Sequence, residues 1–303
     1  MSASAEIDAR EHTELAAALR EMQLLGDSES FTATRFGGGV SCDAWLVTKE
    51  GGAKLAVKRA LPKLRVMAEW RAPAERSRAE AAWFRLAAGI DPGLVPRVLG
   101  EAPQRHMLAM EFFPPDRYPL WKAQLAAGET DSGFAASVGA ALARIHAATA
   151  GSAAVGAQFA NAQQFFALRL EPYLLCTAEQ HADVAVRIRK MADNIAKARI
   201  ALMHGDVSPK NILHAPDGPV FLDAETACYG DPAFDLAFCL NHLLLKCVWH
   251  PEFIAGYLEC FGALASTYVR RVTWEEAADL ECRVTTLLPM LMLARIDGNR
   301  PSD

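Results

Sequence analysis

The stretch from Leu202 to Glu225, LMHGDVSPKNILHAPDGPVFLDAE, concentrates side chains whose chemistry can act together. It contains the carboxylates of Asp206 and Asp223 and, between them, the amide of Asn211. Carboxylate and amide oxygens are ligands of hard cations such as Mg²⁺. The Cys and His residues show none of the spacings typical of a zinc site. The stretch therefore predicts a cation site built from oxygen ligands.

A β-hairpin is the element expected to position these groups. Two short apolar runs, residues 211–214 and 220–223, flank the turn sequence Ala-Pro-Asp-Gly-Pro. Asn211 begins the first strand and Asp223 ends the second, so the hairpin brings both side chains to the same end of its ladder. Asp206 belongs to the loop just before it. One ion within reach of all three oxygens is the expected arrangement.

The first part of the chain has the patterns of a small sheet. Residues 31–36 and the runs flanking Glu50-Gly51-Gly52 predict a strand and a hairpin. A helix is expected over residues 74–89, ended by Gly89, followed by two strands within residues 97–113. Pro114-Pro115 then predicts a hinge.

Helices dominate the remainder. Phe134, Val138, Leu142 and Ile145 recur at helical spacing, and further helices are expected over residues 178–200, 231–247, 252–265 and 273–297. The fold class predicted is α+β, with two lobes. Residues 1–113 form an N-terminal surface helix and a small antiparallel β-rich lobe, and residues 114–303 form a larger helical lobe.

Composition restricts the function classes. The 303 residues are 51% hydrophobic and 22% charged, an ordinary globular composition. A net charge of −5, without a Lys/Arg run, argues against nucleic acid as a partner. Neither a secretory signal nor a continuous apolar span is evident, and seven cysteines without a CxxC pair indicate free thiols. A cytoplasmic protein with no membrane partner is expected.

The motif His204-Gly205-Asp206 followed by Asn211 resembles the H-G-D-x-x-x-x-N loop of the aminoglycoside phosphotransferase and choline kinase family, which has the protein kinase-like fold. Further segments resemble that family in the same order along the chain, between Phe31 and Phe238: FGGGVSCDAWLV, LAVK, LARIH, FLDAE and YGDPAFDLAF. The ordered set is more specific than any one of its members.

This resemblance implies a phosphotransferase with Asp206 as the catalytic base that orients an acceptor hydroxyl and accepts its proton. Asn211 and Asp223 would bind Mg²⁺ that bridges phosphate oxygens of the donor, ATP or GTP. Glu225 is expected either to lie near the metal or to be a solvated turn residue. The remaining polar residues of these motifs are assigned structural roles: His146, His204, Asp231 and Asp235.

The same resemblance places the nucleotide in the first lobe. Glycines allow a loop to approach phosphate oxygens closely, and Lys58 would hold the α- and β-phosphates. Glu80 is the chosen carboxylate partner of Lys58, with Glu75 as the alternative. The full set of expected nucleotide-binding residues is Gly38, Gly39, Ser41, Lys58, Glu80, Met110 and Phe112.

Departures from protein kinases indicate a small-molecule acceptor. Gly205 replaces the arginine of H-R-D, and only a short segment separates Asp223 from Asp231, so no activation segment can dock a protein. Residues 1–113 carry 15 acidic and 15 basic residues, whereas the remainder carries 21 and 16. The negative field favours a cationic acceptor, aminoglycoside-like or choline-like, although solubility explains it equally. Trp121 and Trp249 offer aromatic faces for such a cation, or pack in the core.

A second interpretation belongs to another class of protein. A kinase-like binding or scaffold protein could bind nucleotide without transferring phosphate. Such a protein has no chemical need for Asp206, Asn211, Asp223 and Lys58 together, so the enzyme is favoured.

Overall fold

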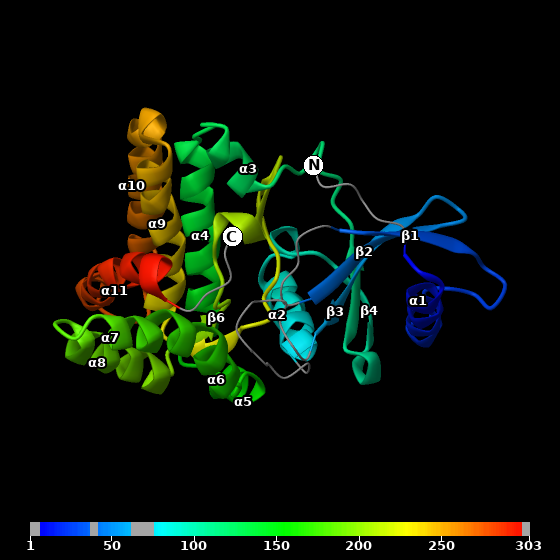
Figure 1. The fold of residues 1–303 in the computed structure, drawn as a ribbon, viewed down its shortest axis with the longest axis horizontal. Helices are drawn as coiled ribbons and strands as arrows, with labels where there is room; N and C mark the ends of the chain where they lie inside the picture. The colour runs from blue at the N-terminus through cyan, green and yellow to red at the C-terminus, as the bar shows by residue number, and fades with distance from the viewer. Residues whose placement is uncertain (1–6, 37–41, 62–75, 299–303) are drawn as a thin grey trace. The chain divides into compact units, whose positions relative to one another are not determined.

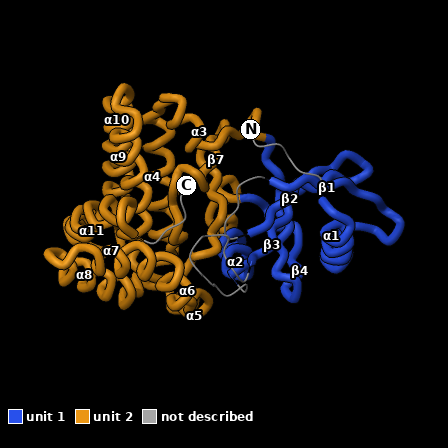
Figure 2. Tube along the Cα trace, in the orientation of Figure 1, with its two compact units in different colours: residues 1–86, 96–114 blue, residues 87–95, 115–303 orange. Residues whose placement is uncertain are grey.

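The computed structural model describes residues 7–36, 42–61 and 76–298. The chain forms two compact units (Figures 1 and 2): unit 1 contains residues 1–86 and 96–114, and unit 2 contains residues 87–95 and 115–303. The sequence placed a single domain boundary after residue 113, which stays a prediction. Residues 87–95, which precede that boundary, group with unit 2.

Unit 1 is built on a five-stranded antiparallel sheet, as the sequence predicted. The strand order is β1-β2-β3-β5-β4, with every neighbouring pair antiparallel. The β2–β3 turn uses Gly52 at φ 81°, a conformation that glycine adopts without steric cost. The strands are β1 (Phe31–Arg35), β2 (Cys42–Lys49), β3 (Lys54–Ala60), β4 (Val98–Ala102) and β5 (Met107–Glu111).

Helix α1 (Ala9–Glu21) is more than a surface helix, which corrects the expectation from sequence. Its residues Leu15 and Leu19 are buried in one core cluster with Trp45 and Val57 of the sheet. Apolar residues spaced four apart give the helix a face to bury, and Glu11 and Glu14 beside that face pair with Arg35 and Arg59 of the sheet. The helix therefore covers one face of the sheet.

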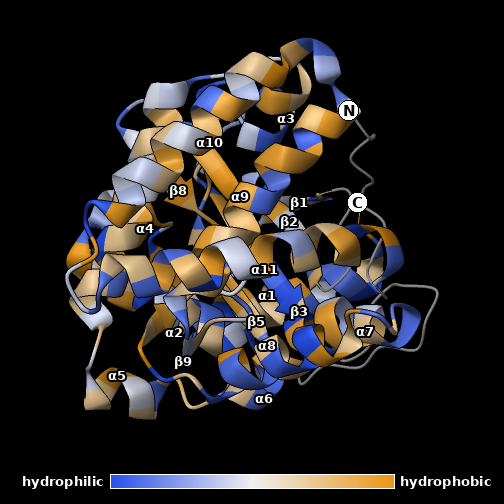
Figure 3. Ribbon diagram, turned by 90° about the vertical axis from the view of Figure 1, so that its left-hand side faces the viewer, coloured by the Kyte–Doolittle hydropathy of each residue, from blue (hydrophilic) through white to orange (hydrophobic). Residues whose placement is uncertain are grey.

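Unit 2 is mainly helical. Helix α9 lies between α10 and α11, and its predominantly hydrophobic colouring in Figure 3 agrees with its buried length. Helices α4 and α10 pack so closely that a Cβ at Gly139 would lie 2.4 Å from the Leu264 carbonyl oxygen. The helices are α3 (Trp121–Ala126), α4 (Ser132–Thr149), α5 (Ala153–Gln158), α6 (Ala162–Phe165), α7 (Cys176–Gln180), α8 (Ala185–Lys197), α9 (Pro232–Trp249), α10 (Ile254–Val269) and α11 (Ala277–Asp297). Helix α2 (Arg76–Ile90) begins in unit 1.

Two features of this unit differ from the sequence prediction. The helix expected over residues 178–200 is interrupted between α7 and α8, where His181 Nε2 lies 2.8 Å from Asp297 Oδ2 of α11. The segment η3 (Phe166–Leu175), which was not predicted, is a π-helix. Apolar periodicity does not reveal these changes, because both depend on contacts made elsewhere in the fold.

Short strands connect the helices of unit 2. The predicted hairpin is confirmed: β7 (Ile212–Ala215) pairs with β8 (Gly218–Phe221) in antiparallel register. A second pair joins β6 (Ala201–Met203) to β9 (Cys228–Gly230). Among the described residues no helix is long and apolar enough to cross a bilayer, and none of the seven cysteines forms a disulfide.

Candidate active site

The loop between β6 and β7 brings Asp206 and Asn211 into contact. Asn211 ends a short 3-10 turn, η4 (Pro209–Asn211), and its Nδ2 donates to Asp206 Oδ2 at 2.8 Å and to the Asp206 carbonyl oxygen at 3.0 Å. Both residues are buried. The amide nitrogen is thus committed to Asp206, so Oδ1 is the Asn211 atom that would contact a cation.

Arg169 is a site residue that the sequence prediction missed. It lies on the π-helix η3, and its guanidinium Nη2 is 2.9 Å from Asp206 Oδ2. Its Nε donates to the Gly205 carbonyl oxygen at 2.8 Å and its Nη1 to the Leu168 carbonyl oxygen at 2.8 Å. Burial acts to lower the pKa of Arg169, but Asp206 and other nearby acids raise it above its ordinary value. The arginine is therefore charged and holds both the carboxylate and the backbone of the loop.

All the contacts of the Asp206 side chain within the described residues converge on one oxygen. Oδ2 accepts from Asn211 and Arg169, and Lys210 Nζ lies 3.7 Å from the same atom. Hydrogen bonds from one neutral and one charged donor fix the carboxylate plane. The second oxygen, Oδ1, is the atom that this arrangement leaves to accept a proton.

Gly205 is required by the backbone of the loop. Its φ is 78°, in the left-handed region, and an added Cβ would lie 2.7 Å from the Thr226 carbonyl oxygen. A side chain here would meet both strain and a steric clash. The glycine of the H-G-D motif thus lets the loop pass against the chain before β9.

Asp235, in the first turn of α9, anchors this loop. Its two oxygens accept from the backbone N–H of His204 at 2.7 Å and of Gly205 at 2.8 Å. Asp235 Oδ2 also lies 3.3 Å from His146 Nε2, and His146 Nδ1 lies 2.6 Å from the Tyr268 hydroxyl. His146 is fully buried. These contacts agree with the structural roles predicted for Asp235 and His146.

His204 supports the loop from inside. Its Nε2 lies 3.0 Å from the Leu222 carbonyl oxygen, and the backbone N–H of Asp206 donates to its Nδ1 at 3.2 Å. Because Nδ1 accepts, the ring proton resides on Nε2 and is donated to Leu222. Burial lowers the pKa of His204, and the nearby carboxylates, Asp235 first, only partly oppose this effect. His204 is therefore neutral and supports the loop through its hydrogen bonds.

Asp223 follows β8, where the Leu222 backbone N–H donates to the Asn211 carbonyl oxygen at 2.8 Å. The hairpin therefore places Asn211 and Asp223 at one end of the ladder, as expected. Asp223 has a left-handed φ of 64° and acts electrostatically on both Arg169 and His204. A left-handed conformation in a residue other than glycine is uncommon and is found at functional sites.

The donor set around Asn211 and Asp223 fits Mg²⁺. It consists of an amide oxygen and a carboxylate, the ligands that this ion prefers. Within the described ranges no three His, Cys, Asp or Glu residues are grouped to hold a metal. A cation here would thus take its remaining ligands from phosphate and water, which is usual for Mg²⁺ with a nucleotide. Glu225 is buried beside this set, which corrects the alternative of a solvated turn.

In unit 1, Lys58 and Glu80 form an ion pair. Lys58 Nζ lies 2.7 Å from Glu80 Oε1, and the side chains are 15% and 3% exposed. Val57 packs against α1, so strand alternation turns Lys58 to the opposite face, toward α2. Glu75, the alternative partner, lies outside the described residues.

The other predicted nucleotide residues belong to unit 1. Met110 is buried on β5 opposite Ala56, and the Phe112 ring stacks on Phe36 with centroids 6.2 Å apart. Their contact with a nucleotide stays a prediction. The predicted loop residues Gly38, Gly39 and Ser41 lie outside the described residues.

A small antiparallel sheet with a Lys–Glu pair, followed by a helical unit with an aspartate loop and a hairpin, defines a kinase-like α+β fold. Residues 32–271 match the Phosphotransferase enzyme family, and the chain belongs to this family.

The chain is also similar to several individual proteins. Methylthioribose kinase 1 of Oryza sativa subsp. japonica is 23% identical over 250 residues, which is 74% of this chain and 58% of that protein. The chain thus spans little more than half the length of this relative. A choline kinase structure from Cryptosporidium parvum matches with a TM-score of 0.58 and 12% identity, covering 91% of this chain and 86% of that one. A macrolide 2'-phosphotransferase structure from Brachybacterium faecium matches with a TM-score of 0.51 and 16% identity. The match covers 97% of this chain and 99% of that one. These two likenesses support the fold.

Proposed function

We propose that this protein is a small-molecule kinase that transfers the γ-phosphate of ATP or GTP to a hydroxyl group. The observation that carries the proposal is the arrangement of Asp206, whose Oδ2 is bound by Asn211 and Arg169 while Oδ1 is left for a proton. A base must lie within hydrogen-bond reach of the hydroxyl proton that it accepts. A carboxylate held through one oxygen meets this need without losing its orientation.

In the proposed reaction Asp206 Oδ1 orients the acceptor hydroxyl and takes its proton as the oxygen attacks the γ-phosphorus. Arg169 holds the carboxylate in place, and Gly205 lets the loop adopt its conformation. General-base assistance of this kind typically contributes about 10²–10⁴-fold in rate.

Asn211 and Asp223 would hold Mg²⁺, whose chemistry here is to neutralise charge on the phosphate oxygens. Lys58 would bind the α- and β-phosphates, with Glu80 fixing its ammonium group at 2.7 Å. Met110, Phe112 and the glycine-containing loop with Gly38, Gly39 and Ser41 would complete the nucleotide site.

The acceptor that we propose is a small hydroxyl compound. The methylthioribose kinases among the relatives are the reason for including a sugar in the test set. The acidic excess of residues 114–303 adds cationic alcohols, because a negative field concentrates cations near the surface. We place the reaction in the cytoplasm, where the nucleotide donor is abundant.

The test is release of ADP or GDP with a panel of acceptors: aminoglycosides, choline, ethanolamine, methylthioribose and homoserine. Acceptor-dependent release that is lost in Asp206→Asn and kept in the surface control Glu281→Gln is the expected result. If every acceptor fails while Mg²⁺-ATP still raises Tm, the protein binds nucleotide without transferring phosphate and the proposal is wrong.

A further inference from the structure

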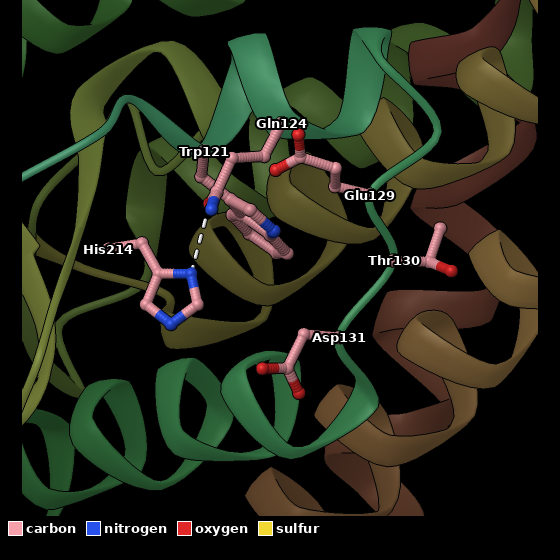
Figure 4. A pocket seen from close by; sticks show the side chains of 6 residues that line it. All are labelled: Trp121, Gln124, Glu129, Thr130, Asp131 and His214. Carbon is pink, nitrogen blue, oxygen red and sulfur yellow. Dashed lines mark hydrogen bonds between the residues drawn. The ribbon is translucent and has the colours of Figure 1, made fainter. Parts of the chain in front are cut away.

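A polar pocket in unit 2 lies at the opposite end of the β7–β8 hairpin from Asn211. It has a volume of about 210 Å³, and it lies between helix α3, the start of α4 and strand β7 (Figure 4). This volume is below the roughly 300–1,000 Å³ of sites for drug-sized ligands, so an occupant is small. The lining residues are Trp121, Gln124, Glu129, Thr130, Asp131 and His214.

Trp121 provides the observation that points to a ligand. The residue is 1% exposed, and its Nε1–H, which is buried, has no hydrogen-bond acceptor within the described residues. In Figure 4 the indole nitrogen is on the side of the ring that faces Glu129, Thr130 and Asp131. A buried donor without an acceptor costs about 1–3 kcal/mol, so such groups are uncommon in folded proteins. An acceptor atom in the pocket would remove this cost.

The polar groups around Trp121 specify what else the occupant must carry. Glu129 and Asp131 are carboxylates, and the lining contains no Lys or Arg. Asp131 Oδ1 accepts from the Phe134 N–H at 2.9 Å as the N-cap of α4, which leaves the second oxygen of the carboxylate for a ligand. Two carboxylates without a cation among the lining residues favour a positively charged group.

The remaining groups mix donors and acceptors. Because an amide oxygen only accepts, His214 Nδ1 donates to Gln124 Oε1 at 2.9 Å. This tautomer leaves His214 Nε2 as an acceptor and the Gln124 amide nitrogen as a donor. Hydroxyl groups both donate and accept, so they can satisfy such a mixed lining.

We propose that this pocket binds a small amine that carries several hydroxyl groups, such as an amino sugar. The ammonium group contacts Glu129 and Asp131, and a hydroxyl oxygen accepts from Trp121 Nε1–H. An anion would face the two carboxylates, and the described residues offer no metal-binding group of three His, Cys, Asp or Glu. Asp206 is not among the lining residues, and the proposal does not require that phosphate transfer occurs.

The test is calorimetric titration of the nucleotide-free protein with D-glucosamine, with D-glucose as the neutral control of the same shape. We expect saturable glucosamine binding, and at least about tenfold weaker binding of glucose, which corresponds to about 1.4 kcal/mol. Absence of saturable glucosamine binding, or equal binding of glucose, overturns the proposal.

Three variants locate the binding. Asp131→Asn removes the charge but keeps an N-cap oxygen, and Trp121→Phe removes the donor while keeping most of the ring. Each should weaken glucosamine binding by at least about tenfold, whereas Glu281→Gln on α11 should leave it unchanged. Trp121→Phe breaks no hydrogen bond among the described residues, but the smaller ring leaves space in the core, so its Tm should fall while the fold is retained.

Two outcomes contradict this location. Unchanged glucosamine affinity in Asp131→Asn and Glu129→Gln would show that the carboxylates are not used, even if Trp121→Phe fails to fold. Loss of binding in Asp206→Asn, with affinity retained in the pocket variants, would place glucosamine at the candidate active site. Neither outcome bears on phosphate transfer itself, which is measured separately by nucleotide release.

Discussion

Each unit contains one ion pair that is central to its proposed role, and the two pairs are built differently. In unit 1, Lys58 on a strand meets Glu80 on a helix. In unit 2, Arg169 lies on a π-helix and meets Asp206 on a loop, with the guanidinium also bound to two carbonyl oxygens. Regular elements present the first pair, whereas irregular backbone presents the second.

This difference in construction matches the two proposed roles, nucleotide binding for Lys58 and proton transfer for Asp206. A lysine paired with a carboxylate can release part of its interaction to a phosphate, because its ammonium group is a compact charge on a flexible stem. An arginine with three hydrogen-bonding partners is rigid, and it fixes the orientation of the carboxylate that it contacts. The comparison predicts that changes at Arg169 affect folding, and that changes at Lys58 affect mainly nucleotide binding.

The largest expected effect is on catalysis. Asp206→Asn should lower the acceptor-dependent rate by about 10²–10⁴-fold, because the amide cannot accept the hydroxyl proton. The amide oxygen can still accept from Arg169, so folding should be retained. Steady-state nucleotide release gives kcat, and calorimetry should show nucleotide affinity within a few-fold of the parent. A variant with the parent's kcat would remove Asp206 from the mechanism.

The second prediction tests the rigid pair through stability. Arg169→Met should lower the unfolding free energy by about 3–5 kcal/mol, because it leaves a buried carboxylate without its cation. Lys58→Met is the matched change in unit 1, and we expect a smaller loss there because Arg169→Met also removes hydrogen bonds to the Gly205 and Leu168 carbonyl oxygens.

Urea unfolding of both variants at neutral pH measures this difference. In the double variant with Asp206→Asn, much of the loss in Arg169→Met should be recovered, since the buried charge is gone. Equal losses for Arg169→Met and Lys58→Met would show that the two pairs do not differ as described.

The third prediction concerns the backbone beside the second pair. Gly205→Ala should lower the unfolding free energy by at least about 1–3 kcal/mol, because alanine is strained at φ 78° and its Cβ meets the Thr226 carbonyl oxygen. Gly262→Ala, in the regular helix α10 where a Cβ meets nothing within 4 Å, should instead raise it by about 0.5–1 kcal/mol. Chemical denaturation distinguishes the two signs, and a stabilising Gly205→Ala would contradict the need for glycine in the loop.

The smallest expected effect is a pH dependence that arises from His204. Its pKa is lowered in the folded protein from the ordinary value of 6.5, so the unfolded chain binds more protons in the window below 6.5. The unfolding free energy should therefore fall as the pH drops from 6.5 toward the folded pKa. His204→Gln, which can still donate to the Leu222 carbonyl oxygen, should show a shallower fall in metal-free protein. Identical pH profiles would assign the effect to other groups.

The same contrast explains what could be predicted from the sequence. Strand alternation around Val57 allowed an inward Lys58, and turn residues between two apolar runs predicted the hairpin that brings Asn211 and Asp223 together. These inferences succeed because the alternation of side chains along a strand and the residue preferences of a turn depend only on neighbouring residues in the sequence. The buried role of α1 was missed because its polar face dominates its composition.

Arg169 could not be found in this way. It precedes Asp206 by 37 positions, and a π-helix shifts its side chain out of the register that a regular helix would give. An arginine within the mainly apolar segment FALRLEPYLL was the available signal, because a buried charge requires a partner. The identity of that partner depends on tertiary structure alone.

The carboxylate of Asp235 has a consequence for how this scaffold can change. One residue of α9 orients the peptide groups of His204 and Gly205, while Arg169 on η3 is the residue of segment 153–197 that holds the Asp206 carboxylate. Segments α5 to α8 could then be exchanged between relatives to alter acceptor choice, provided that the arginine on η3 is kept. In such chimaeras the acceptor specificity could change while the residues proposed to transfer phosphate stay the same.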